Sequence, residues 1–173
     1  MKYRNAFLFF LAAFLLQSTL VTSFGIMGIT PNFILCMTVI FSFLYKGNQG
    51  LVFGVIFGLL QDIGFSILIG PSSMIYFFIA LLMSEIRHYL YRDSILNLFF
   101  ASAIGTGLYY PVHWLVLRVF RGNYRFVFML KSLPLLFLFH FIIITVFYIA
   151  VGKRSIRHPR DRYYKGGRMY GIN

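Results

Sequence analysis

The chain has 173 residues, of which 60% are hydrophobic, 20% are aromatic and only 12% are charged. Soluble globular domains are about half apolar and about a quarter charged, so this composition argues against a soluble enzyme, a disordered tail or a secreted disulfide scaffold and predicts an all-α, polytopic membrane protein. The 16 Lys and Arg residues outnumber the 4 Asp and Glu residues, a balance that in a membrane protein is typical of basic cytoplasmic loops rather than of nucleic-acid binding.

Three helices are expected in the first half of the chain. No Lys, Arg, Asp or Glu occurs between Asn5 and Tyr45, a stretch long enough for two membrane crossings. The Gly- and Pro-containing segment 25–31 interrupts it. The pattern therefore predicts helices over 6–24 and 31–45, the second too short for a full crossing and tucked between its neighbours. A third helix is predicted over 50–69.

Three further helices are expected in the second half, at 73–86, 94–117 and 132–151, with a basic, aromatic connection at 118–131. Pro111 predicts a kink in the fifth helix. The whole forms one six-helix transmembrane domain over 1–152, followed by a basic cytoplasmic tail over 153–173.

The distribution of basic residues predicts the orientation in the membrane. With six crossings, 12 of the 16 Lys and Arg residues fall on one side and four fall on the other. Cytoplasmic loops carry the excess of basic residues, so both termini are expected in the cytoplasm. The connection at 118–131 would lie outside, where it anchors to lipid headgroups or contacts a protein.

One face of the third helix carries small residues and a carboxylate. Gly50, Gly54, Gly58 and Asp62 recur every four residues and so share a helical face. Small residues at this spacing allow membrane helices to approach closely, which predicts a packing seam. An acidic residue within a span is a functional candidate. For Asp62 we weigh a structural role, capping the turn at 70–71 or pairing with Gln17 or His113, ahead of ion or proton handling.

Basic residues on the predicted cytoplasmic side form two groups. Arg87 and Arg92 belong to a charged turn, interpreted as an interfacial salt-bridge cluster or as a cytoplasmic contact surface. Lys153, Arg154 and Arg157 open the tail, which is expected to touch anionic lipid or to dock on a cytoplasmic partner.

The remaining polar and aromatic residues do not suggest chemistry. Tyr109, Tyr110 and Trp114 are interpreted as an interfacial aromatic belt. The four histidines are scattered over different segments without acidic or Cys partners, so no metal site is expected. No Ser or Cys has a visible base partner. We therefore expect no enzyme activity and no cofactor.

Several of these residues together resemble the family of rod shape-determining MreD proteins. Thr30-Pro31-Asn32 opens an apolar helix, and Gln17-Ser18-Thr19 lies in the helix before it. The most specific part is the run from Gly50 through Gly54 and Gly58 to Leu59-Leu60-Gln61-Asp62, followed by Gly70 and a polar turn. The motif residues beyond the glycine face are Gln17, Pro31, Asn32, Gln61 and Gly70. The resemblance covers roughly residues 6–90.

The resemblance implies a non-catalytic scaffold in the bacterial cytoplasmic (inner) membrane. Proteins of this family associate with MreC, and through it with MreB filaments and the RodA–penicillin-binding-protein synthase, and so support lateral peptidoglycan synthesis and cell shape. On this interpretation the glycine face packs within the chain or against the membrane helix of MreC, and Asp62 orients that packing through a buried hydrogen bond.

The same resemblance implies an alternative from another class. The MreD fold is similar to the substrate-binding S components of energy-coupling-factor vitamin transporters, which dock through spaced alanines in their first helix. Here Ala12 and Ala13 are adjacent and neither has an alanine four residues away, which counts against a transporter.

Overall fold

The computed structural model describes residues 2–23, 30–66, 68–90, 94–121 and 126–152, and this part of the chain folds into six α-helices. A π-helical turn, Tyr148–Gly152, continues the last helix. The expected fold class, all-α with six helices, is confirmed. The helices are α1 (Tyr3–Ser23), α2 (Phe33–Leu44), α3 (Gln49–Phe65), α4 (Pro71–Tyr89), α5 (Ile95–Arg121) and α6 (Phe126–Phe147).

The largest departure from prediction is the segment 118–131. α5 continues to Arg121 and α6 begins at Phe126, so most of the predicted connection is helical and that prediction is wrong. Basic and large apolar side chains do not end a helix. Gly122-Asn123, which favours a turn, lies outside the described residues. The prediction took the basic, aromatic composition of 118–131 as a sign that the helix had ended.

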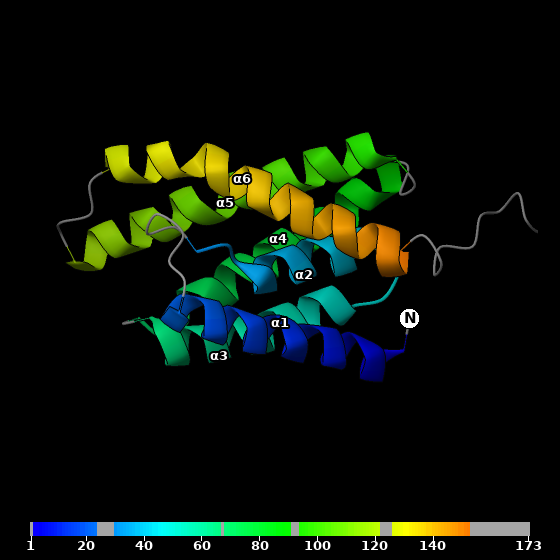
Figure 1. Cartoon of the computed structure of the whole chain (residues 1–173), viewed down its shortest axis with the longest axis horizontal. Helices are drawn as coiled ribbons and strands as arrows, with labels where there is room; N and C mark the ends of the chain where they lie inside the picture. Colours follow the sequence, from blue (N-terminus) through cyan, green and yellow to red (C-terminus); the bar gives the residue numbers. More distant parts are fainter. Residues whose placement is uncertain (1, 24–29, 67, 91–93, 122–125, 153–173) are drawn as a thin grey trace, which may run out of the picture.

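α2 is the central helix of the bundle. Eleven of its 12 residues are buried, and it contacts all five other helices. Figure 1 shows it in the middle of the bundle. At 1.5 Å per residue it is about 18 Å long, short of the ~30 Å hydrocarbon core. The expectation of a short second helix tucked between its neighbours is confirmed.

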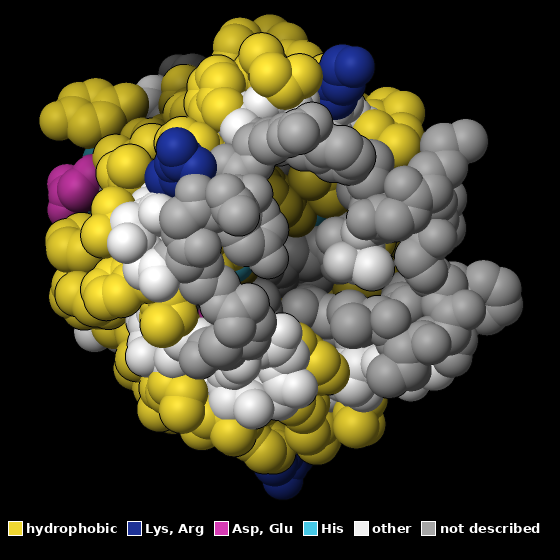
Figure 2. All heavy atoms as spheres, turned by 90° about the vertical axis from the view of Figure 1, so that its left-hand side faces the viewer, with side chains coloured by type: hydrophobic (Ala, Val, Ile, Leu, Met, Phe, Trp, Pro, Cys, Tyr) yellow, Lys and Arg dark blue, Asp and Glu magenta, His cyan; other side chains and the backbone are white. Residues whose placement is uncertain are grey.

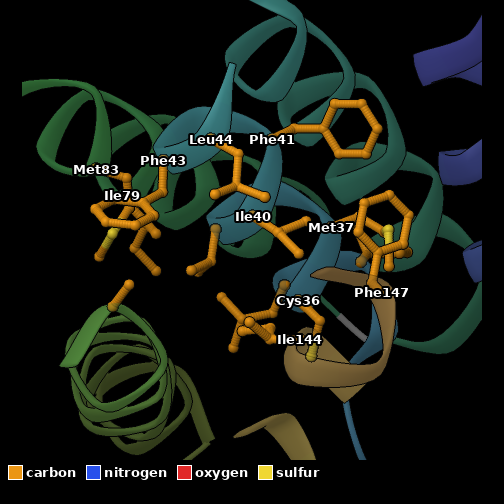
Figure 3. Close-up of a cluster of buried hydrophobic side chains, with 14 of the residues drawn as sticks. Cys36, Met37, Ile40, Phe41, Phe43, Leu44, Ile79, Met83, Ile144 and Phe147 are labelled. Carbon is orange, nitrogen blue, oxygen red and sulfur yellow. The ribbon is translucent and has the colours of Figure 1, made fainter. Parts of the chain in front are cut away.

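The apolar core surrounds α2. Figure 3 shows its side chains directed to two sides, toward α4 and toward α6. The labelled residues are Cys36, Met37, Ile40, Phe41, Phe43 and Leu44 from α2, Ile79 and Met83 from α4, and Ile144 and Phe147 from α6.

The glycine face of α3 packs inside the chain. A Cβ at Gly50 would meet Ser42, and one at Gly54 would meet Thr38, both on α2. A Cβ at Gly58 would meet Tyr76 and the Ser73 backbone on α4. Small residues let helix backbones approach this closely. The three glycines therefore seat α3 against two neighbouring helices, and all three are buried.

The outer surface of the bundle is apolar. Exposed large hydrophobic side chains occur on all helices except α2. Examples are Leu8, Ile63, Phe78, Leu115 and Ile142. A contiguous apolar exterior of this kind suits lipid and not water. Within the described residues, two stretches are long and apolar enough to cross a membrane, Ile95–Phe120 and Met129–Val151.

The helices run back and forth along one long axis. In Figure 1 the N-terminus and the end of α6 lie at one end of the bundle, and the end of α5 and the start of α6 lie at the other. Figure 2 looks onto that second end, where apolar side chains predominate among the described residues.

Candidate functional site

Polar side chains gather in the interior of this otherwise apolar bundle. The buried polar side chains that hydrogen-bond between elements are Gln17, Asn32, Gln61, Asp62, Ser72, Tyr76, Thr106, Tyr109 and His140. They come from α1, α3, α4, α5 and α6 and from Asn32, the residue that caps α2. Buried polar groups are costly unless they are hydrogen-bonded, so this network restricts how the helices can be arranged.

Asn32 connects three elements at the start of α2. Its Oδ1 accepts the N–H of Leu35 at 2.9 Å, which is the N-cap interaction. Its Nδ2 donates to the hydroxyl of Tyr76 on α4 at 2.5 Å, and its backbone N–H donates to Nε2 of His140 on α6 at 2.9 Å. Oε1 of Gln17 on α1 accepts the N–H of Ile34 at 3.3 Å. The backbone donors at the start of α2 thus hold α1 and α6 in place, and the Asn32 side chain holds α4.

His140 has both ring nitrogens engaged. Because Nε2 accepts the Asn32 N–H, the ring proton lies on Nδ1, which donates to the hydroxyl of Thr106 on α5 at 2.9 Å. The ring also stacks on Tyr110, with centroids 5.9 Å apart. His140 is therefore a neutral bridge between α2, α5 and α6.

A chain of side-chain hydrogen bonds continues through α3, α4 and α5. The Tyr76 hydroxyl donates to Oε1 of Gln61 at 2.7 Å, and Nε2 of Gln61 donates to the hydroxyl of Tyr109 at 3.2 Å. The Tyr109 hydroxyl is also 3.1 Å from Oγ of Ser72. The rings of Tyr76 and Tyr109 stack at 5.3 Å. Gln61 is thereby satisfied at both ends of its amide.

Asp62 holds the turn that starts α4. Its Oδ2 accepts the backbone N–H groups of Gly70 and Ser72, both at 2.9 Å. Gly70 adopts φ = 114°, a conformation that favours glycine, and Pro71 takes the first helical position. A carboxylate at this end also interacts favourably with the helix dipole. Of the roles considered for Asp62, the structure shows the capping one; Gln17 bonds α2 instead.

A pocket of about 210 Å³ lies beside this turn. Its lining residues are Gln61, Asp62, Phe65, Ser66, Ser72, Tyr109, His113 and Leu117. His113 stacks on Tyr109 at 5.3 Å and lines the same pocket as Asp62. Within the described network, Oδ1 of Asp62 is the one buried side-chain atom without a hydrogen-bond partner.

The structure brings together most of the predicted motif residues. Gln17, Asn32, Gln61 and Gly70 all take part in the network or in the Asp62 turn, and Pro31 directly precedes the cap. The glycine face lies next to it, on the same helix as Asp62.

The predicted cytoplasmic residues lie elsewhere. Arg87 is at the far end of α2, where its guanidinium donates to the carbonyl oxygens of Ser42 and Tyr45. It therefore satisfies carbonyls at the C-terminal end of α2. Arg92, Lys153, Arg154 and Arg157 lie outside the described residues.

Sequence reasoning missed five members of the network, namely Ser72, Tyr76, Thr106, Tyr109 and His140. Tyr109 was assigned to an interfacial belt, but it is 3% exposed and bonds Gln61. A usable signal existed on α5, where Thr106, Tyr109 and His113 recur at three and four residues along an otherwise apolar helix. Such a polar stripe predicts an inward face.

The arrangement is suited to holding helices together. In the described part of the chain, no three His, Cys, Asp or Glu side chains gather as a metal site would need. Each titratable member of the network is committed to a structural hydrogen bond.

Residues 3–153 match the family model described as rod shape-determining protein MreD. No curated protein and no solved structure matches the chain.

Proposed function

Because this chain belongs to the MreD family, whose proteins are membrane-associated and act in rod-shape determination, we propose that it is a multi-pass scaffold of the bacterial cell-elongation complex. In this role it binds MreC, and through MreC it is linked to MreB and to the RodA–penicillin-binding-protein synthase. It would thus help to direct lateral peptidoglycan synthesis without performing catalysis.

The observation that supports a scaffold is the network linking all six helices. Asn32 alone connects α2 to α4 and α6, and the Gln61 amide connects α4 to α5. A fully connected polar network specifies one arrangement of the elements that carry it. A fixed arrangement is what a protein needs if it is to hold its partners at set positions.

The surface offered to MreC lies away from the glycine face, because α2 and α4 already cover Gly50, Gly54 and Gly58. We place the MreC helix on an apolar groove of about 340 Å³ between α5 and α6. The groove contains Ala103 and Gly107, whose small size allows a partner helix to approach closely. Its other lining residues are Phe99, Thr106, Leu133, Pro134 and Phe137.

The orientation is also part of the proposal. Both termini face the cytoplasm, together with Arg87, Arg92 and the basic tail from Lys153 to Arg168, where anionic lipids and MreB are found. The end of the bundle that Figure 2 shows then faces outward.

Co-purification tests the partners. Tagged protein is recovered from native membranes in mild detergent, and the co-purifying proteins are identified by mass spectrometry. We expect MreC with the wild-type chain. Gly107→Leu fills the groove and should reduce MreC recovery at least tenfold, whereas Gly64→Leu, at a position with nothing within 4 Å on α3, should not.

Two outcomes would contradict the proposal in different ways. Equal MreC recovery with both variants would exclude the groove but leave the scaffold. Recovery of paired ATPases and a coupling membrane subunit in place of MreC would favour the S-component alternative, for which the Asp62 pocket is a candidate ligand site.

A further inference from the structure

Asp62, which lines this pocket, has an acceptor atom that no described residue satisfies. Asp62 is fully buried, and its Oδ2 is occupied by the Gly70 and Ser72 N–H groups. Its Oδ1 has no partner among the described residues. Buried carboxylate oxygens are normally hydrogen-bonded, because leaving one unpaired forfeits its hydration without compensation. The missing partner must be a donor.

The pocket that Asp62 lines is large enough for more than one water. A water occupies about 30 Å³ of liquid volume, against the pocket volume of about 210 Å³. Asp62 is the only acidic residue among the eight that line the pocket. A donor that also carries positive charge makes a stronger bond to a carboxylate than a neutral donor does.

The other walls suit a small organic cation. The stacked rings of Tyr109 and His113 form one side, and Phe65 and Leu117 add apolar surface. Aromatic faces attract cations through the ring quadrupole. The hydroxyl of Tyr109 and the side-chain amide of Gln61 already hydrogen-bond to each other, so we do not expect either of them to bind the ligand.

From this geometry we propose that the pocket binds a primary ammonium group, which donates to Oδ1 of Asp62. The ammonium group can belong to a free amine or to the headgroup of an ethanolamine phospholipid, which share this chemistry. The site is separate from the α5–α6 groove, so this inference does not rest on MreC binding there.

Binding is measured on the purified full-length chain in detergent, through the dependence of the unfolding temperature on ligand concentration. The probe is ethanolamine, which is protonated at neutral pH like other alkylamines. Two control ligands separate its properties: choline keeps the charge without N–H donors, and ethylene glycol keeps a donor without the charge. We expect a dissociation constant for ethanolamine at least tenfold lower than for either control.

Two variants locate the site. Asp62→Asn retains an oxygen for the Gly70 and Ser72 N–H groups but places an amide N–H where the ammonium would bind, so affinity should fall at least tenfold. Leu117→Phe narrows the pocket without touching the Asp62 bonds and should also weaken binding. Leu115→Phe, at a residue that is 54% exposed on the same helix, is the matched control and should leave affinity unchanged.

A lipid arm identifies the source of the ammonium. The chain is reconstituted in nanodiscs containing phosphatidylethanolamine or phosphatidylcholine, and retained lipid is detected by native mass spectrometry. Selective retention of phosphatidylethanolamine by wild type but not by Asp62→Asn assigns the lipid, and ethanolamine binding without such retention assigns a free amine. Equal affinities for the three small ligands, or unchanged ethanolamine affinity in both pocket variants, would overturn the proposal and leave a water-filled pocket.

Discussion

Replacing Gly58 by alanine probes the contact that holds α3 against α4. A Cβ at this position would lie 2.6 Å from Cδ2 of Tyr76 and 2.9 Å from Cα of Ser73. Ordinary contact begins at 3.4 Å, so the new methyl group must be relieved by a displacement of about 0.5 Å at a backbone atom that cannot rotate away. Tyr76 can yield only by disturbing its hydrogen bonds to Asn32 and Gln61.

Two effects of opposite sign determine the size of the change. Overpacking a well-packed interior costs about 1–3 kcal/mol, whereas alanine favours a helix over glycine by about 1 kcal/mol. Gly107→Ala, in the middle of α5 with nothing within 4 Å of the added Cβ, carries the second effect alone. We therefore expect the free energies of unfolding of the two variants to differ by about 1–3 kcal/mol, with Gly58→Ala the less stable.

The measurement is reversible unfolding in mixed micelles, with the denaturing detergent increased stepwise and the helix content followed by circular dichroism. The difference between the two variants cancels the propensity effect. A difference below about 0.5 kcal/mol would refute the reasoning, because it would mean that α3 and α4 are not in such close contact in the folded protein.

The remaining predictions concern the network and the orientation. Asn32→Ala removes an N-cap worth about 1 kcal/mol and also removes the hydrogen bond that the buried Tyr76 hydroxyl accepts, at a cost of about 1–3 kcal/mol, so the same unfolding assay should show a loss of about 2–4 kcal/mol. Tyr76→Phe leaves Gln61 Oε1 and Asn32 Nδ2 unpaired and should lower the free energy of unfolding by about 1–3 kcal/mol. The control Tyr89→Phe, at a side chain that is 84% exposed, should leave it unchanged. An equal loss of stability in both variants would contradict the role of the network. A reporter fused after Asn123 should be active outside the cell, and a cytoplasmic signal there would exclude the orientation proposed above.

Local signals in the sequence predicted the helices. Charge-free stretches and Gly–Pro interruptions identified six helices, and the range predicted for the second helix, 31–45, contains the observed α2, Phe33–Leu44, with Asn32 as its cap. The spacing of Gly50, Gly54 and Gly58 predicted a seam. Each of these signals depends only on a few neighbouring residues, which is why the sequence was sufficient.

Such local signals could not predict which polar side chains would hydrogen-bond between helices. Whether Gln61 meets Tyr109 depends on how α3 and α5 are rotated about their axes, and no local pattern fixes both rotations. The seam illustrates the same limit: spacing predicted close packing, but only the structure shows that α2 and α4 supply the partners. The extent of α5 was missed because a basic, aromatic composition was interpreted as a loop.

Burial of apolar side chains does little to hold these helices together, because lipid is as apolar as the core. The interior of the bundle relies on two other kinds of contact. The α2–α3–α4 group relies on close backbone approach at the glycines. The α5–α6 hairpin is joined to that group by polar links, from His140 to Asn32 and from Tyr109 to Gln61. Such bonds are directional, so they fix the hairpin's rotation as well as its distance. The groove that we assign to MreC lies on this hairpin, and its position relative to the rest of the bundle is therefore set by the same buried hydrogen bonds.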